Sequence, residues 1–282
     1  MPLVSVLMSV HNDARFVAEA VQSVLDQTLT DFELVVVDDA STDETPQLLA
    51  AFGDERIRVL RNEQRSGLAA SLNRGLDDAQ GHYVARLDSD DVARADRIER
   101  QVARIETEPR VAVVGSAVAD LDEHGRRGRT HVMPSGVRPL RWLALFSSPF
   151  FHPSVLVDRE TLDAHALRYD PEFLESEDYD LWARLFAFAD GDNLREPLVS
   201  KRVHAGQASQ RRRDVQEAFQ CRVALREIGR VAPEVDAGAA WRVGARQSGG
   251  SRKEFLRLLR AFERRHGRDW NVRNAAVRAL LA

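Results

Sequence analysis

The chain opens with a regular alternation of apolar runs and helical segments, and this alternation sets its fold class. The runs LVSVLMSV (3–10) and FELVVVDD (32–39) are rich in valine and lack polar alternation, which is typical of strands covered on both faces. Between them, apolar side chains recur at helical spacing over residues 14–27. The same alternation continues with strands predicted at 57–61, 82–88 and 110–122, and helices at 41–52, 67–79 and 94–105. Short links between these segments predict a doubly wound, mostly parallel sheet flanked by helices.

The rhythm of the sequence changes after residue 110. EHGRRGR (123–129) predicts a polar turn that returns as a hairpin, and residues 137–146 and 177–189 have amphipathic helical spacing. From residue 206 onward we find only helical patterns, which break near Pro233 and at SGGS (248–251). We therefore expect a body over residues 1–205 and a helical appendage over residues 206–282.

Composition narrows the class of protein. The chain is 44% hydrophobic and 30% charged, as in soluble proteins with a real core. Its longest apolar stretches, such as 111–119, fall short of the ~20 residues that span a bilayer. No signal-peptide pattern opens the sequence, and the single Cys221 cannot form an internal disulfide. These features predict a cytoplasmic protein.

The charge is distributed unevenly. Residues 201–282 hold 19 Lys and Arg against 8 Asp and Glu, a balance of +11, whereas residues 1–200 hold 21 against 36, a balance of −15. One interpretation is that the basic region binds an anionic partner, such as the inner face of a membrane, through peripheral association. The other is that it is a solvated helical face. No nucleic-acid partner is expected.

Polar clusters follow three of the predicted strands. HND (11–13), DDASTD (38–43) and DSDD (88–91) each come directly after an apolar run. Ligands of open α/β sheets bind at the carboxyl ends of the strands, so these clusters mark a candidate binding edge. The sequence contains neither G-x-G-x-x-G after the first strand nor G-x-x-x-x-G-K-[ST], which disfavours dinucleotide-dependent dehydrogenases and P-loop enzymes.

The acidic cluster DSDD is the strongest candidate for a metal site. Asp88 and Asp90 are two residues apart on an extended strand end, so both carboxylates can reach one hard cation, Mg²⁺ or Mn²⁺. The alternative is a surface turn whose aspartates cap the following helix. We expect Asp91 to cap that helix or to support the loop.

The other two clusters offer groups that suit a nucleotide. Asp38 and Asp39 have two possible roles. They either belong to a turn and cap a helix, or they offer a carboxylate that accepts a hydrogen bond from the imide N–H of uracil or thymine. At the end of the first strand, Ser9 and His11 offer a hydroxyl and a flat ring, and Asp13 lies beside them. Arg65 is a candidate contact to phosphate or a structural residue of its loop.

The order of these segments resembles the family 2 glycosyltransferases of the GT-A fold. The resemblance runs over residues 2–120 and resumes at 152–160, 177–185 and 201–209. It implies a Rossmann-like sheet, with a nucleotide-binding half over 1–110 and an acceptor-binding half over 111–205. It also implies an inverting transferase that uses a nucleotide-diphosphate sugar and Mn²⁺ or Mg²⁺.

The resemblance assigns roles to particular positions. Asp39 is similar to the base-binding aspartate of the family, and Asp88 and Asp90 match its D-x-D motif. Asp90 is then the direct metal ligand, and Asp88 lies nearer the ribose and the metal waters. His204 resembles a histidine that closes over the metal and diphosphate in some members.

The resemblance also places the catalytic base in SEDYDLW. Asp178 occupies the position of the base, and Glu177 is the neighbour that orients it or the sugar. Acidic residues also favour a helix N-terminus for electrostatic reasons alone. Phe150, His152 and Trp182 are candidates to contact the sugar or acceptor, or else they belong to the core.

We expect a uridine nucleotide, with thymidine left open because it presents the same imide edge. The expected acceptor is a glycan or a lipid-linked glycan in cell-surface polysaccharide or lipopolysaccharide biosynthesis. Two alternatives are a sugar nucleotidyltransferase and a non-catalytic module that binds sugar nucleotides or polysaccharide. The first would want a glycine-rich basic loop after the first strand, where this chain has HNDARF.

Overall fold

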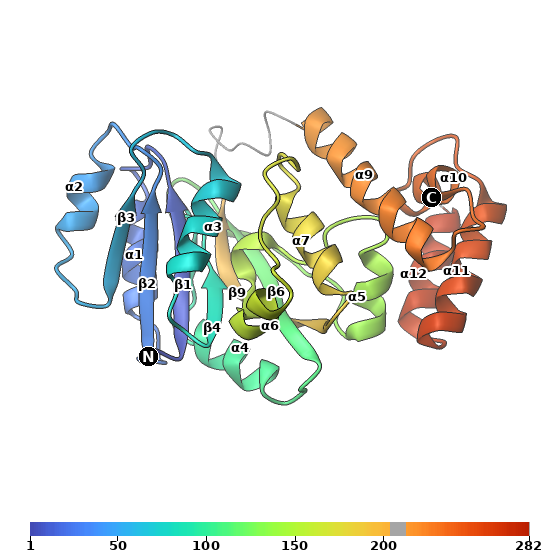
Figure 1. Cartoon of the computed structure of the whole chain (residues 1–282), viewed down its shortest axis with the longest axis horizontal. Helices are drawn as coiled ribbons and strands as arrows, with labels where there is room; N and C mark the ends of the chain where they lie inside the picture. The colour runs from blue at the N-terminus through green and yellow to red at the C-terminus, as the bar shows by residue number, and fades with distance from the viewer. Residues whose placement is uncertain (204–212, 282) are drawn as a thin grey trace. The chain divides into compact units, whose positions relative to one another are not determined.

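The computed structural model describes residues 1–203 and 213–281 (Figure 1). The chain folds into two compact units, which we call the sheet unit and the helical unit. The sheet unit comprises residues 1–133, 150–171 and 189–207, and the helical unit comprises residues 134–149, 172–188 and 208–282.

One sheet of mixed direction forms the centre of the sheet unit. Its strands are β1 (Val4–Val10), β2 (Phe32–Asp38), β3 (Ile57–Arg61), β4 (Tyr83–Arg86), β5 (Val92–Ala93), β6 (Val111–Leu121), β7 (Arg127–His131), β8 (Leu156–Asp158) and β9 (Asp190–Arg202). The order of the strands is β3-β2-β1-β4-β8-β6-β9-β5, with β7 paired to β6. Strands β1 to β4 are parallel, and so are β6 and β9, whereas β8 runs antiparallel to both of its neighbours.

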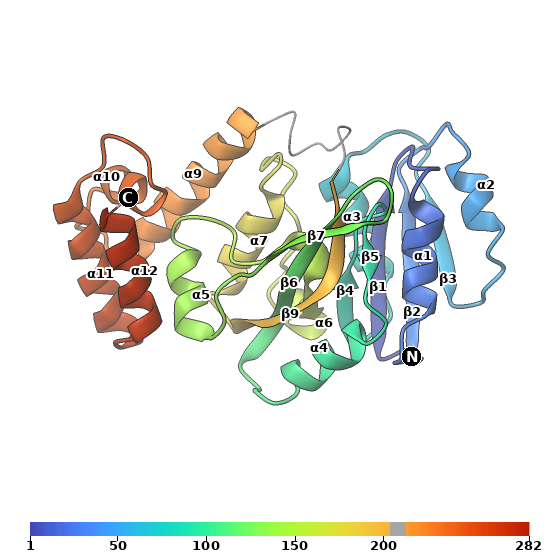
Figure 2. The ribbon, with the colours of Figure 1, turned by 180° about the vertical axis from the view of Figure 1, so that it is seen from behind.

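Helices cover both faces of this sheet (Figures 1 and 2). They are α1 (Val17–Leu25), α2 (Thr45–Ala50), α3 (Leu68–Asp78), α4 (Arg97–Ile105) and α6 (Arg159–Ala164), with a 3₁₀ turn at His152–Ser154. Apolar residues of α1 and α4 pack in one core with Met8 and Val36 of the sheet. The opposite face carries α3, where Gly75 lies against Leu7 so closely that a Cβ would clash with that side chain. Burial on both faces explains the uninterrupted apolar runs of β1 and β2.

The helical unit has its own core. Its helices are α5 (Val137–Leu143), α7 (Glu177–Leu185), α9 (Arg213–Val231), α10 (Ala237–Gly244), α11 (Arg252–His266) and α12 (Trp270–Leu281). Trp142 of α5 lies at the centre of this core, with its ring edge-to-face against Phe146, Phe255 and Phe262 at 5.1 to 5.6 Å. A smaller cluster joins Tyr179 and Ala183 of α7 to Val223 of α9.

Several expectations differ from this fold in detail. The units do not follow the expected boundary at residue 205, because α5 and α7 contribute Trp142 and Tyr179 to cores shared with α9 and the helices after it. Strands β5, β8 and β9 were not expected. The helix expected over 41–52 is shorter in the structure, where α2 has Glu44 as its N-cap and Pro46 in its first turn.

Candidate functional site

The carboxyl ends of β1, β2 and β4 lie side by side in the sheet. Because these strands are neighbours and parallel, the polar segments that follow them, at 11–13, 38–43 and 88–91, meet at one edge. The hydroxyl of Ser89 donates to Oδ2 of Asp13 at 2.7 Å, which joins the segment after β4 to the segment after β1. His11 Nδ1 lies 2.7 Å from the backbone oxygen of Asp39, which joins β1 to β2. The convergence expected from the sequence is present.

Asp39 holds the loop between β3 and α3 in place. Its Oδ1 accepts hydrogen bonds from Asn62 Nδ2 at 2.7 Å and from the Ser66 amide at 2.8 Å, and its Oδ2 accepts one from the Gly67 amide at 2.9 Å. Burial raises the pKa of the Asp39 carboxyl, but these donors outweigh it, so the pKa is lowered overall. Gly67 has φ of +87°, a conformation that favours glycine and brings its amide to the carboxylate.

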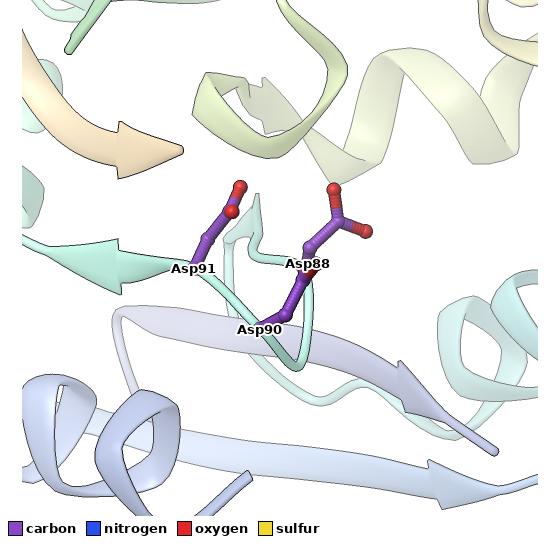
Figure 3. A group of neighbouring side chains, drawn as sticks. All are labelled: Asp88, Asp90 and Asp91. Atoms are coloured by element: carbon purple, nitrogen blue, oxygen red, sulfur yellow. The ribbon is translucent and has the colours of Figure 1, made fainter. Parts of the chain in front are cut away.

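Three carboxylates gather on the turn between β4 and β5. Asp88, Asp90 and Asp91 each offer an oxygen, and these oxygens all lie within 4.8 Å of one another. Figure 3 shows the side chains of Asp88 and Asp91 pointing to the same side of this turn. Mutual repulsion makes such a cluster costly unless a cation or a proton offsets it.

Asp91 is the deepest member of the cluster. Its side chain is 1% exposed; Oδ1 accepts a hydrogen bond from the Arg202 amide at 2.8 Å, and Oδ2 is buried without a hydrogen-bond partner. Burial raises the pKa of Asp91 well above its usual range, and the charges of Asp88 and Asp90 raise it further. Asp91 does not cap the next helix, whose N-cap is Asp96, so that expectation was wrong, whereas the expected support of the loop is present in the bond from Arg202.

Arg202, the last residue of β9, holds the turn between β4 and β5 in place through several hydrogen bonds. Besides its amide, its Nε donates to the backbone oxygen of Asp90 at 2.8 Å and its Nη2 donates to Oε2 of Glu19 at 2.5 Å. Its guanidinium stacks on the ring of Phe16, 4.3 Å from the centroid. These contacts leave the turn little freedom to rearrange.

Arg86 supplies a positive charge beneath the cluster. Its side chain is buried in β4 and its Nη2 forms an ion pair with Oδ1 of Asp88. The Nε and Nη1 atoms of Arg86 are buried without a hydrogen-bond partner. A guanidinium at this position offsets one negative charge of the cluster.

The residues of this turn fit a hard divalent cation. Three carboxylates converge from one short segment, and the buried Oδ2 of Asp91 has no hydrogen-bond partner. Oxygen donors of this kind are the ligands that Mg²⁺ and Mn²⁺ prefer. Asp88 and Asp90 were expected as the pair, and the geometry adds Asp91 to it.

His152 lies in the 3₁₀ turn of the sheet unit. Its Nε2 lies 2.9 Å from the hydroxyl of Tyr169, and burial lowers the pKa of the ring well below its usual range, with Arg86 and Lys201 acting in the same direction. Phe150, by contrast, is 2% exposed and belongs to the core, which is the alternative that the sequence left open. The lowered pKa of His152 favours its neutral imidazole.

The expected catalytic base lies in the helical unit. Asp178 is half-buried in the first turn of α7, and its Oδ2 accepts a hydrogen bond from the hydroxyl of Ser148 at 3.1 Å. Glu177 beside it is buried. Trp182 is 0% exposed and packs inside the unit, so it follows the alternative of a core residue.

The remaining candidates are placed as follows. Ser9 is half-buried at the end of β1, and Arg65 is exposed on the loop that Asp39 holds. His204 lies outside the described residues. Arg202 was missed by the sequence reasoning, because only the fold brings β9 to the turn after β4. A signal for Arg86 does exist, since it interrupts the apolar run VARLD.

None of the described helices combines the length and the apolar composition needed to cross a membrane. The fold is similar to that of several solved structures. TarS of S. aureus in complex with UDP-GlcNAc matches 92% of this chain and 79% of its own with a TM-score of 0.62 at 20% identity. The mannosyltransferase PcManGT of Pyrobaculum calidifontis, in complex with GDP-Man and Mn²⁺, matches 100% and 80% with a TM-score of 0.60 at 18% identity. These likenesses show the GT-A fold.

Sequence comparison leads to the same family. Putative glycosyltransferase EpsE of Bacillus subtilis (strain 168) is 37% identical over 208 residues, which cover 71% of this chain and 73% of the relative. Succinoglycan biosynthesis protein ExoO of Rhizobium meliloti (strain 1021) is 32% identical over 200 residues, 66% of this chain and 56% of the relative. The profile of glycosyl transferase family 2 matches residues 5–164. This chain is a glycosyltransferase and belongs to glycosyl transferase family 2.

Proposed function

We propose that the chain is an inverting, metal-assisted transferase that moves a sugar from a nucleotide-diphosphate sugar to a hydroxyl acceptor. The observation that carries the proposal is the cluster of Asp88, Asp90 and Asp91 at the carboxyl end of β4, with the buried Oδ2 of Asp91 lacking a hydrogen-bond partner. A divalent cation held by such a cluster would stabilise the negative charge of a departing diphosphate. It lies at the sheet edge where open α/β folds bind nucleotides.

The donor nucleotide is a uridine diphosphate sugar. The Asp39 carboxylate, whose pKa is lowered by three donors, is an acceptor suited to the imide N–H of uracil. Cytosine and adenine have no N–H at the corresponding ring position, whereas guanine presents its N1–H beside an amino group and not as an imide. TarS, a neighbour in fold, is solved with UDP-GlcNAc, which supports the same choice.

The carboxylates of Asp88 and Asp90, with Asp91 beside them, would hold Mn²⁺ or Mg²⁺. A bound divalent cation supplies positive charge against the diphosphate as its bond to the sugar breaks. Arg202 and Arg86 hold the turn and part of its charge in place before the donor arrives. The Mn²⁺ in PcManGT supports a cation of this class.

Asp178 takes the proton of the acceptor hydroxyl. The base must be separate from the cation-binding carboxylates, because a carboxylate bound to a cation is a poor proton acceptor. The hydroxyl of Ser148 donates to Oδ2 of Asp178 and so fixes the plane of the carboxylate. Glu177 orients Asp178 or the sugar from the same helix turn.

The acceptor belongs to a cell-surface polysaccharide. The relative ExoO is named for succinoglycan biosynthesis, a polysaccharide pathway, which supports this class of acceptor. The nucleophile is then a hydroxyl group of a glycan or of a lipid-linked glycan.

The proposal is tested by assaying release of nucleoside diphosphate from UDP, GDP and dTDP sugars with Mn²⁺ present and absent. We expect turnover of a UDP-sugar that needs the cation and falls by about a thousandfold or more in Asp90→Ala and Asp178→Ala. Asp178→Ala should still bind UDP as tightly as wild type in calorimetry, because it acts on the acceptor.

Asp77→Asn is the matched control, since Asp77 is a 66% exposed carboxylate whose partner is Arg168. Its activity should equal that of wild type. Full activity in Asp178→Ala would show that the base lies elsewhere. If Asp90→Ala turned over the donor without any added cation, the metal would have no part in the mechanism.

A further inference from the structure

The last helix, α12, carries two apolar stripes on opposite sides. Val272 and Ala276 are 1% exposed and pack in the core of the helical unit. Trp270, Val277 and Leu281 are 75%, 53% and 80% exposed. At 3.6 residues per turn these three side chains leave the helix within about 40° of one another, on the side away from the core. The exposed stripe therefore contributes nothing to the core described here.

Arginines border the exposed stripe on both sides. On the helix surface, Arg273 lies on one side of the stripe and Arg278 lies on the other. Both side chains are exposed. Over residues 252–281, α11 and α12 with their link hold nine Lys and Arg against three Asp and Glu, which leaves a balance of +6. The surface around the stripe is strongly basic.

The three acidic residues of this stretch already have partners. Glu254 pairs with Arg257, Glu263 pairs with Arg273 at 2.5 Å, and Asp269 accepts the amides of Asn271 and Val272 at the start of α12. The excess positive charge is thus not neutralised by the acids of its own segment. Of the basic residues, Arg264 pairs with Glu234 at 3.5 Å, which offsets only part of the excess.

We propose that α12 docks on an anionic lipid surface, with Trp270, Val277 and Leu281 entering the headgroup layer and the arginines meeting lipid phosphates. Tryptophan prefers the boundary between headgroups and acyl chains, and a helix with an apolar stripe bordered by arginine lies flat in that boundary. Anionic headgroups attract the basic surface.

A second copy of this chain fits the same surface less well. Pairing of α12 with itself would bring two stretches of +6 together, and juxtaposed like charges oppose association. A bilayer supplies both the apolar layer and the negative charge that the stripe and its borders require. The inference concerns α12 alone and does not depend on the proposed function.

Tryptophan fluorescence gives a direct test on the unmodified chain. The protein has four tryptophans, of which Trp142, Trp182 and Trp241 are buried, so a change on adding vesicles reports mainly on Trp270. With vesicles of phosphatidylcholine and phosphatidylglycerol we expect a blue shift and protection from iodide quenching. Pure phosphatidylcholine vesicles should give a much smaller change, and high salt should reverse the binding.

Sedimentation with the same vesicles separates the two contributions. The Trp270→Ser/Leu281→Ser variant and the Arg273→Gln/Arg278→Gln variant should each bind anionic vesicles about tenfold more weakly. The matched control Arg127→Gln/Arg129→Gln removes two exposed arginines of β7 and should bind as wild type does. Circular dichroism and thermal melting confirm that each variant is folded.

Two results would overturn the inference. One is that the protein does not bind the vesicles, or that both α12 variants bind them as well as wild type does. The other is a concentration-dependent rise in mass without lipid, seen by light scattering and lost in the Trp270→Ser/Leu281→Ser variant, which would make a second copy the occupant. In either case transferase activity on a soluble acceptor would be unaffected, so the proposed function is tested separately.

Discussion

The guanidinium of Arg86 lies in an ion pair with the carboxylate of Asp88, at the first position of the D-x-D motif. The pair places an internal cation where an external cation would bind. Under the proposed function, Arg86 would compete with the divalent cation for Asp88, and it lowers the negative charge of the cluster.

Removing that charge should strengthen metal binding. We expect Arg86→Met to bind Mn²⁺ in the absence of nucleotide roughly tenfold more tightly than wild type, because the site loses one positive charge. The metal-free variant should also melt at a lower temperature, since Asp88 loses its partner. Electron paramagnetic resonance of free Mn²⁺ measures the affinity.

Arg86→Lys is the matched control for this prediction. It keeps the charge and should bind Mn²⁺ with nearly the wild-type affinity. Weaker Mn²⁺ binding in Arg86→Met would mean that the arginine shapes the site rather than competing for it.

We expect the buried carboxyl of Asp91 to destabilise the site in the absence of a cation. In Asp91→Asn the amide oxygen can still accept from the Arg202 amide, while one buried negative charge beside Asp88 and Asp90 is removed. We expect the metal-free variant to be more stable by about 1 kcal/mol, or about 2–4 °C in Tm. Scanning calorimetry with and without Mn²⁺ should show the stabilisation by Mn²⁺ largely lost.

The same measurement identifies a different role for Asp91. If Mn²⁺ stabilised Asp91→Asn as much as wild type, Asp91 would be a support of the loop and not a part of the metal site.

Arg202 should set the geometry of the site without touching substrate. Lys at this position keeps the charge but cannot donate to Asp90 and Glu19 together through a planar fork. We expect Arg202→Lys to weaken Mn²⁺ affinity by about 10–100-fold, as is usual for residues that orient metal ligands. The KM for the donor should rise with it, measured at several Mn²⁺ concentrations.

Excess Mn²⁺ offers the check on Arg202. Saturating Mn²⁺ should restore most of kcat in Arg202→Lys if the arginine acts through the metal turn. A kcat that stays low at saturation would place its role elsewhere.

Glu33 makes stability depend on pH away from the site. Burial raises its pKa, but hydrogen bonds from Ser5, Arg58 and the Gln80 amide outweigh this, so the pKa is lowered from its ordinary value of 4.5. Because the folded-state pKa lies below the ordinary value, ionised Glu33 stabilises the fold at pH values above that ordinary value. This stabilisation is lost as the pH falls through the folded-state pKa. Urea unfolding as a function of pH measures this dependence.

We expect Glu33→Gln to be less stable than wild type at neutral pH by about 1–3 kcal/mol, and to lose less stability on acidification. Glu108→Gln, a change at an exposed carboxylate, should follow the wild-type curve. Parallel curves for Glu33→Gln and wild type would contradict the assignment.

Elements with strong local signals could be predicted from the sequence. The unbroken apolar runs of β1 and β2 predict buried strands, and the parallel order of β1, β2 and β4 then brings Asp13, Asp39 and Asp88 to one edge. Local sequence is enough here because each polar cluster directly follows its strand.

Elements that depend on distant partners could not be predicted in this way. In β9 the polar residue Asp192 is buried because Arg104 of α4 pairs with it at 2.6 Å, and Pro197 interrupts the strand pattern. The burial of Asp91 similarly depends on Arg202, which is 111 residues away in the chain. Such pairings follow from the fold, so no local period reveals them.

The helical unit is assembled from three separate stretches of the chain, and the polypeptide crosses five times between the two units. If recombination replaced only the stretch after residue 208, Trp142 of α5 and Tyr179 of α7 would lose the aromatic and aliphatic neighbours they pack against. New C-terminal regions could therefore not be acquired by simple gene fusion at one junction. The two shorter stretches and the C-terminal one have to change together, which ties the inheritance of the last helices to that of the expected catalytic aspartate.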